Sequence, residues 1–252
     1  MVEVHNVTKQ YGGKTVVDHV SLSVNKGSIT SFIGPNGAGK STLLSMMSRL
    51  ICQDSGEIRI NGQEIRQVKS QELARTISIL KQSNDVHIRL TVRELVNFGR
   101  FPYSQGRLNR EDQQYVNEAI DYMGLTEMQD KYLDHLSGGQ RQRAFIALVL
   151  AQNTDYILLD EPLNNLDMKH SVQIMKVLRR LVDELGKTIL IVLHDINFAS
   201  VYSDYIVAMK DGRVLQEGPA KEIIDTSILQ SLYDMDIQIE QINGHQICVY
   251  YT

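Results

Sequence analysis

Short apolar stretches broken by glycine-containing turns dominate the first third of the chain. Four of them have the alternation or the continuous apolar character of strands: Val2–Val7, Ser21–Val24, Ser28–Ile33 and Ile58–Ile60. After Gly34 the period changes, because Leu43, Met46, Met47 and Leu50 are spaced i, i+3, i+4, i+7. This spacing predicts one helix within a region, residues 1–83, that is otherwise mostly β.

The middle of the chain, from residue 91 to residue 151, has a helical pattern. Two capping-box sequences, Thr91-x-x-Glu94 and Ser137-x-x-Gln140, mark helix starts. Apolar residues between them recur at helical spacing, and the second box opens a helix expected to run through Leu150. The pattern therefore predicts a helical region between two β-rich ones.

Strands and helices alternate after Asp155. The expected elements are a strand at Tyr156–Leu159, a helix striped from Val172 to Leu185, a strand at Thr188–Leu193, a short helix at Asp195–Ser203 and a strand at Tyr205–Met209. Such alternation is typical of a parallel sheet with right-handed crossovers, so the predicted fold class is α/β. A hairpin is expected further on, at Asn243-Gly244.

The composition is that of a globular protein. The 252 residues are 42% hydrophobic and 22% charged, and the net charge of −4 argues against a protein held mainly by nucleic-acid phosphates. Cys52 and Cys248 stand alone, without metal-site spacing. The start of the chain lacks the features of a secretory signal, and the longest apolar run, Ala144–Ala151, is far shorter than the roughly 20 residues of a membrane span.

A phosphate-binding loop follows the third predicted strand. The sequence is Gly34-Pro35-Asn36-Gly37-Ala38-Gly39-Lys40-Ser41, followed by Thr42, and it fits the pattern GxxxxGK[ST]. Glycines let the backbone curl and direct its N–H groups at phosphate oxygens, and the next helix adds its positive end. Lys40 is expected to reach the β- and γ-phosphates, and the Ser41 hydroxyl to ligate Mg²⁺.

Two carboxylates, Asp160 and Glu161, end the apolar strand at Tyr156–Leu159. Ligand sites of α/β proteins lie at such strand ends, so we expect Asp160 to orient Mg²⁺ through water and Glu161 to polarise a water that attacks the γ-phosphate. The 120 residues from Lys40 to Asp160 are too many for a direct crossover. Residues 84–155 are therefore expected to form an inserted helical subdomain, and residues 1–83 and 156–252 the catalytic core. The sequence lacks an Asn-Lys-x-Asp motif for recognition of guanine, which argues against a GTPase.

A third motif, Leu136-Ser137-Gly138-Gly139-Gln140, lies ahead of the acidic strand. In this order the three motifs resemble those of ATP-binding cassette (ABC) ATPases over essentially the whole chain. The resemblance implies a P-loop NTPase fold, with a RecA-like parallel sheet core, an antiparallel β subdomain and an inserted α-helical subdomain. It also implies that Ser137, Gly138, Gly139 and Gln140 contact ATP held by the P-loop of a second copy, in a head-to-tail dimer.

Further positions match the family one by one. Tyr11 resembles the aromatic residue that stacks on adenine, and Gln82 the glutamine that touches Mg²⁺ and the attacking water. Asp167 resembles the aspartate that crosses the dimer interface. His194 resembles the histidine that bonds the γ-phosphate and positions Glu161, the expected base. The implied cofactors are ATP and Mg²⁺.

The segment Leu95–Tyr103 resembles the GRxP segment of the iron–siderophore, haem and cobalamin importers, and Gln140–Ala147 also fits that branch. This resemblance implies a peripheral subunit at the cytoplasmic face of the membrane that energises siderophore uptake. Its implied partners are integral permease subunits and, indirectly, an extracytoplasmic substrate-binding protein, with no nucleic acid. The alternatives are an importer for another metal, cobalamin or haem, and a soluble ABC ATPase acting on nucleic acid. A free-standing P-loop kinase would have no use for Leu136–Gln140.

A basic stretch runs from Ile88 to Arg110, with five arginines and Glu94 as its single acid. It could meet acidic permease loops or lipid headgroups, or it could be a solvated helix face. Neutralising Arg100 and Arg107 would separate these interpretations, which the sequence leaves open.

Overall fold

The structure is a computed structural model that describes residues 1–82, 88–164 and 166–251. The predicted subdomain boundary near Asn84 lies outside the described residues. The chain divides into two compact units, one made of Met1–Val68 with Thr188–Thr252 and the other of Lys69–Lys187. The predicted subdomain limits at residues 84 and 155 stay a prediction, and the two units are described separately.

The first unit contains an antiparallel sheet of order β2-β1-β4-β5. Its strands are β1 (Val2–Tyr11), β2 (Lys14–Val24), β4 (Ser55–Ile60) and β5 (Gln63–Glu64). Val2 pairs with both Val24 and Ile60, so apolar side chains from three strands meet on one face. Asn61 and Gly62 both have positive φ, and their turn joins β4 to β5.

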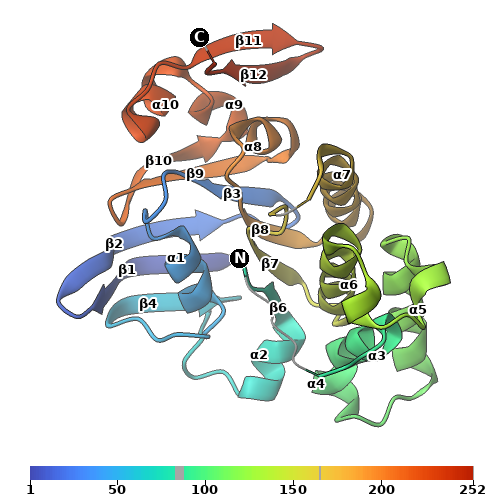
Figure 1. Cartoon of the computed structure of the whole chain (residues 1–252). Helices are drawn as coiled ribbons and strands as arrows, with labels where there is room; N and C mark the ends of the chain where they lie inside the picture. The colour runs from blue at the N-terminus through green and yellow to red at the C-terminus, as the bar shows by residue number, and fades with distance from the viewer. Residues whose placement is uncertain (83–87, 165, 252) are drawn as a thin grey trace. The chain divides into compact units, whose positions relative to one another are not determined.

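The same unit contains strands in the order β10-β9-β3-β8. They are β3 (Ile29–Ile33), β8 (Thr188–Val192), β9 (Tyr205–Lys210) and β10 (Arg213–Pro219). Every residue of β3 and β8 is buried, and β3 runs parallel to both β8 and β9, as the alternation predicted. Two helices, α1 (Lys40–Met47) and α8 (Ile196–Tyr202), follow β3 and β8 (Figure 1).

Helix α1 is shorter than the apolar spacing predicted. It ends at Met47, and Arg49 has a left-handed φ of 58°, so Leu50 lies beyond the helix and is 43% exposed. The inclusion of Leu50 in the helical stripe was wrong. The Arg49 guanidinium donates to the carbonyls of Ile65, at 2.8 Å, and Val68. These bonds connect the end of α1 to the segment that follows β5.

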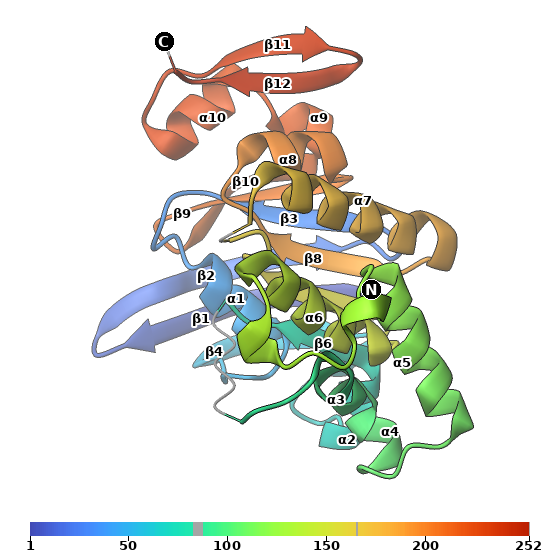
Figure 2. The same cartoon turned by 45° about the vertical axis from the view of Figure 1, so that its right-hand side comes forward.

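The C-terminal part of the first unit comprises α9 (Ala220–Ile223), α10 (Thr226–Tyr233) and a hairpin of β11 (Gln238–Ile242) and β12 (His245–Val249). The predicted turn at Asn243-Gly244 is confirmed, with positive φ at both residues. The hairpin lies beside α8 (Figure 2), because the Asn197 amide donates to the Cys248 carbonyl at 3.2 Å and accepts from the Cys248 N–H at 2.7 Å.

The second unit contains two parallel strands and most of the helices. The strands are β6 (Ile77–Leu80) and β7 (Tyr156–Asp160). The helices are α2 (Ser70–Thr76), α3 (Val92–Asn97), α4 (Phe101–Ser104), α5 (Arg110–Tyr122), α6 (Gly138–Ala151) and α7 (Met168–Leu185), with 3₁₀ turns at Phe98–Arg100, Thr126–Met128 and Leu133–His135. Both predicted capping boxes are present at the starts of α3 and α6. Helix α2 was not predicted, since Leu73 is its single buried residue and no apolar stripe marks it.

No helix in the described part of the chain is long and apolar enough to span a bilayer.

Candidate nucleotide-binding site

The glycine loop between β3 and α1 has a backbone shape that is possible only because two of its residues, Gly34 and Gly39, have no side chain. Gly34 has a φ of +140°, and a Cβ there would lie 2.0 Å from the carbonyl oxygen of Met209. Gly39 has a φ of +94°, and its Cβ would lie 2.5 Å from the carbonyl oxygen of Val16. Both contacts are with backbone, which cannot move aside, so neither position accepts another residue.

Lys40 begins α1 and lies inside the curl of the loop. It is 5% exposed, and its Nζ donates to the carbonyl of Gly34 at 2.8 Å and of Pro35 at 2.9 Å. Gly39 caps the helix without a side chain, so no side-chain oxygen from the cap covers the first N–H groups of α1. A buried ammonium beside such a helix start suits a phosphate, because both the charge and the helix dipole attract anions.

The acidic loop after β7 is held by side chains. Asp160 and Glu161 are 7% and 9% exposed, and Glu161 has a left-handed φ of 51°, which strains a residue other than glycine. The Gln82 amide donates to Oε2 of Glu161 at 2.6 Å, and the Asn164 amide donates to the same oxygen. The structure thus brings Gln82 to Glu161. Asn164 was not predicted, although its place three residues after Glu161 was a usable signal.

The Ser137 motif forms the N-terminus of α6. The Ser137 hydroxyl accepts from the N–H of Gln140 at 3.3 Å, and the Gln140 side chain accepts from the N–H of Ser137 at 3.0 Å. Gly138 and Gly139 occupy the first turn of the helix. One turn on, the Gln142 amide donates to the Pro162 carbonyl at 2.9 Å, which ties α6 to the loop after Glu161.

The remaining predicted residues lie at element ends. Tyr11 ends β1 and is 51% exposed, with the Lys9 ammonium 5.4 Å from its ring centroid. Asp167 caps α7, and the backbone N–H of His170 lowers the pKa of its carboxyl. His194 is exposed and follows β8.

The predicted residues are distributed over both units. Tyr11, residues 34–42 and His194 belong to the first unit, and Gln82, residues 137–140, Asp160, Glu161 and Asp167 to the second. Within the second unit, Glu161 joins Gln82 directly, whereas Asp167 forms its hydrogen bonds with His170 of its own helix.

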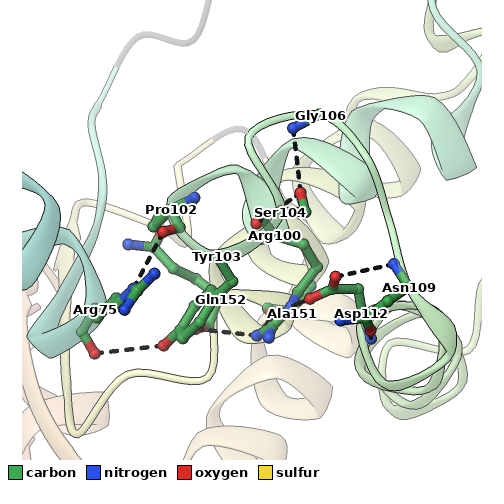
Figure 3. A network of polar contacts seen from close by, with 10 residues as sticks. All are labelled: Arg75, Arg100, Pro102, Tyr103, Ser104, Gly106, Asn109, Asp112, Ala151 and Gln152. Carbon is green, nitrogen blue, oxygen red and sulfur yellow. Dashed lines mark hydrogen bonds and ion pairs between the residues drawn. The ribbon is translucent and has the colours of Figure 1, made fainter.

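The GRxP-like segment contains a buried arginine (Figure 3). Arg100 is 3% exposed, and it donates to Asp112 Oδ1 at 2.9 Å and to the Ala151 carbonyl at 3.0 Å. Its guanidinium carbon lies 3.9 Å from the ring centroid of Tyr103 and 4.4 Å from that of Tyr115. The prediction that Arg100 faces a permease, lipid or solvent was therefore wrong, because the side chain is fully engaged inside the unit.

The same segment is connected to α2 and β6. The Pro102 carbonyl accepts from the Arg75 guanidinium at 3.1 Å (Figure 3). It also accepts from the Gln71 amide at 3.2 Å. The Gln152 amide, at the end of α6, donates to the Ile77 carbonyl at 3.1 Å. Since Gln82 lies just after β6, these contacts connect the helices to the segment that carries Gln82.

An apolar groove of about 360 Å³ opens beside this segment. Its lining includes Leu90, Leu108, Phe98 and Phe101, and the two phenylalanines are 54% and 58% exposed. Exposed aromatic residues grouped at one groove are typical of a protein-binding surface.

Comparison with known proteins gives the same picture. The family model described as "ABC transporter" matches residues 17–164, more than half of the chain. The petrobactin import ATP-binding protein YclP of Bacillus subtilis is 68% identical over 252 residues, which are 100% of both chains. The petrobactin import ATP-binding protein FatE of Bacillus anthracis is 50% identical over 95% of this chain and 96% of its own.

Among solved structures, the dimeric post-hydrolysis cassette MJ0796 with ADP and Pi has a TM-score of 0.78 at 33% identity. The match covers 87% of this chain and 99% of that one. The fold and the motifs thus define an ATP-binding cassette, and the chain belongs to the ABC transporter family. The predicted fold class and the prediction of an ABC ATPase are confirmed, and the chain's relatives lie in the siderophore branch that Leu95–Tyr103 indicated.

Proposed function

We propose that this chain is the ATP-hydrolysing subunit of an importer for a ferric siderophore of the petrobactin class. The assignment of the transported substrate is supported by the 68% sequence identity, over the full length, to a relative that is named for petrobactin import. The chemical assignment is carried by one observation, the burial of Lys40 in a loop whose glycines leave no room for a Cβ. That arrangement gives a fixed cation and backbone N–H groups for a triphosphate.

Residues 34–42 bind the phosphates of ATP, and Lys40 exchanges its bonds to the Gly34 and Pro35 carbonyls for bonds to phosphate oxygens. Tyr11, exposed at the end of β1, stacks on the adenine.

Mg²⁺ fits the donors that the chain offers for it. Ser41, Gln82 and Asp160 provide a hydroxyl, an amide and a carboxylate oxygen, the hard donors that Mg²⁺ prefers. No group of three or more His, Cys, Asp or Glu residues suited to a metal occurs among the described residues. This suits Mg²⁺, which usually takes one or two carboxylates together with substrate phosphates and water. When bound, the ion would offset charge on the phosphates.

Glu161 accepts a proton from the water that attacks the γ-phosphate. Its carboxylate is oriented by the amides of Gln82 and Asn164, which both donate to Oε2. His194 hydrogen-bonds the γ-phosphate and holds the water in line.

Two copies of the chain act together, with ATP between them. Ser137, Gly138, Gly139 and Gln140 present the N-terminus of α6 to the nucleotide of the second copy, and Asp167 contacts that copy. The dimeric structure of the MJ0796 cassette supports this arrangement.

The permease subunits bind the groove lined by Phe98 and Phe101, which places the chain at the cytoplasmic face of the membrane. An extracytoplasmic binding protein acts indirectly, through the permease, and no nucleic acid is involved. The arginines of the basic stretch that remain as candidates for contact with permease or lipid are Arg89, Arg107 and Arg110. Arg93 is engaged inside the unit, where its guanidinium donates to Gln129 and Asn117.

Reconstitution with a siderophore permease that binds this chain tests the proposal. Wild-type protein is expected to support ATP-dependent uptake of ferric petrobactin into vesicles, whereas Lys40→Ala is expected to lose both nucleotide binding and uptake. Phe98→Ser should keep the ATPase activity of the isolated chain but lose permease binding. Retention of nucleotide binding by Lys40→Ala would refute the site, and uptake of an unrelated chelate alone would refute the cargo.

A further inference from the structure

The C-terminal segment, residues 220–249, lies outside the part of the chain that the family model matches. The proposed chemistry uses none of its residues. Its helix α10 begins at the cap Asp225, which accepts from the N–H groups of Ser227 and Ile228, and it ends at Tyr233, before Asp234 turns the chain with a φ of 55°. A well-defined helix thus ends at one particular tyrosine.

The Tyr233 hydroxyl reaches the first residue of the glycine loop. The backbone N–H of Gly34 donates to the Tyr233 oxygen at 3.1 Å, across 199 positions of sequence. Burial raises the pKa of Tyr233 to about 12, so the hydroxyl keeps its proton at neutral pH. The Gly34 N–H therefore has a neutral side-chain acceptor that comes from a distant helix.

The end of α10 is fixed to β9 by a second set of bonds. Lys210 donates from Nζ to the Ser231 carbonyl at 2.7 Å and to the Asp234 carboxylate at 2.7 and 2.8 Å. Lys210 directly follows Met209, whose carbonyl oxygen fills the space where a Gly34 Cβ would lie. The C-terminus of α10, the end of β9 and the start of the loop are thus packed together.

Gly34 is held from both sides of its α-carbon. Its N–H donates to Tyr233, and its carbonyl accepts from Lys40 at 2.8 Å. Glycine has the widest backbone freedom of any residue, so external bonds are needed to keep one conformation at a φ of +140°. The bond to Tyr233 acts on the very residue whose carbonyl orients the phosphate-binding lysine.

We propose that Tyr233 is a positioning residue of the nucleotide site, which fixes Gly34 and thereby orients Lys40 and the loop before ATP binds. This inference rests on the proposed role of residues 34–42 in binding ATP. Tyr233 itself does not touch the nucleotide. A merely structural tyrosine would change the melting temperature alone, whereas a positioning residue changes nucleotide affinity and KM more than kcat.

The experiment compares Tyr233→Phe with the wild-type chain and with Tyr205→Phe, which removes a hydroxyl from β9 of the same unit. Affinity for ATP and ADP is measured by calorimetry, and amide exchange of Gly34 by NMR on glycine-labelled protein. Tyr233→Phe should weaken nucleotide binding about fivefold, as expected for one lost hydrogen bond. Exchange of the Gly34 amide should become faster by about the same factor. Tyr205→Phe should leave both quantities unchanged.

Wild-type affinity and Gly34 exchange in folded Tyr233→Phe would overturn the inference, even if the melting temperature falls. If Tyr233→Phe does not fold, Lys210→Met provides the test, because it loosens the end of α10 without touching the loop. A weakening of nucleotide binding by Lys210→Met supports the inference, and unchanged binding overturns it. Loss of binding in Lys40→Ala alongside a normal Tyr233→Phe would leave the proposed function standing and remove this inference alone.

Discussion

The glycine loop of the first unit and the acidic loop of the second are shaped in opposite ways. Gly34 and Gly39 can take their conformations only because they lack a Cβ, for which the neighbouring backbone leaves no room. Glu161 takes its place because Gln82 and Asn164 donate to its carboxylate. Adding a Cβ to the glycine loop should abolish its conformation, because the neighbouring backbone cannot move aside. Removing one hydrogen bond from the acidic loop should reduce its activity only in part, because the other bond remains. Substitutions in the two loops can test this difference.

Gly34→Ala should have the largest effect on the nucleotide site. The new Cβ would lie 2.0 Å from the Met209 oxygen, at a φ that alanine avoids. We expect a loss of about 3 kcal/mol or more in the free energy of unfolding, together with loss of ATP binding. Urea unfolding and calorimetry measure the two effects.

Gly62→Ala is the matched control for Gly34→Ala. Its φ is +82°, but nothing lies within 4 Å of its Cβ, so only the backbone strain of about 1 kcal/mol should appear, with ATP binding intact. Equal losses of unfolding free energy in the two variants would show that backbone strain, and not the close approach to Met209, determines the effect of Gly34→Ala.

Glu161→Gln should lower kcat by about 10²- to 10⁴-fold, because the amide cannot accept the proton of the attacking water. Affinity for ATP should stay close to that of the wild type, since Glu161 does not bind the phosphates in this account. Phosphate release and calorimetry measure both. Glu127→Gln, an exposed change in the same unit, should leave kcat unchanged. Wild-type turnover by Glu161→Gln would mean that another group acts as the base.

Arg100→Met tests the side-chain contacts that support the second unit. It leaves the Asp112 carboxylate, 2% exposed, without its cation, and we expect a loss of about 3–5 kcal/mol in the free energy of unfolding. Arg107→Met, at an exposed position of the same basic stretch, should change it by less than about 0.5 kcal/mol. Similar small effects in both would mean that the ion pair contributes nothing to the unit.

Asn164→Ala should have the smallest effect. It removes one of the two amides that hold Glu161 and leaves Gln82 in place, so kcat should fall about tenfold while the KM for ATP stays unchanged. Steady-state kinetics give both values. A loss as large as that of Glu161→Gln would contradict the stepwise behaviour expected of this loop.

The same contrast explains what the sequence could reveal. The glycine loop is a run of consecutive residues whose backbone requirement is visible in the residue types themselves, and the capping boxes at Thr91 and Ser137 are equally local. The contact of Gln82 with Glu161 spans 79 positions, and only a family resemblance indicated that Gln82 belongs to the site at all. The contact of Tyr233 with Gly34 spans 199 positions and has no local signal at all.

Charge patterning does not predict the environment of Arg100, which is decided by packing. The arginines between Ile88 and Arg110 look alike in sequence, yet Arg100 is buried between Tyr103 and Tyr115 and paired with Asp112. Its partners lie 3 to 52 residues away and come from different helices. Helix α2 was overlooked for a related reason, because its contacts to Pro102 are polar and leave no apolar stripe.

The oligomeric state of Glu161→Gln tests the central claim most directly, because the account holds that two copies enclose ATP and separate after its hydrolysis. Sedimentation velocity is run with ATP and magnesium, with ATP and a chelator, and on the double variant Lys40→Ala, Glu161→Gln. The account predicts a dimer of two 28.6 kDa chains in the first sample and monomers in the other two. The account would be contradicted if the first sample stays monomeric although calorimetry shows that ATP is bound, and if adding the permease does not produce the dimer.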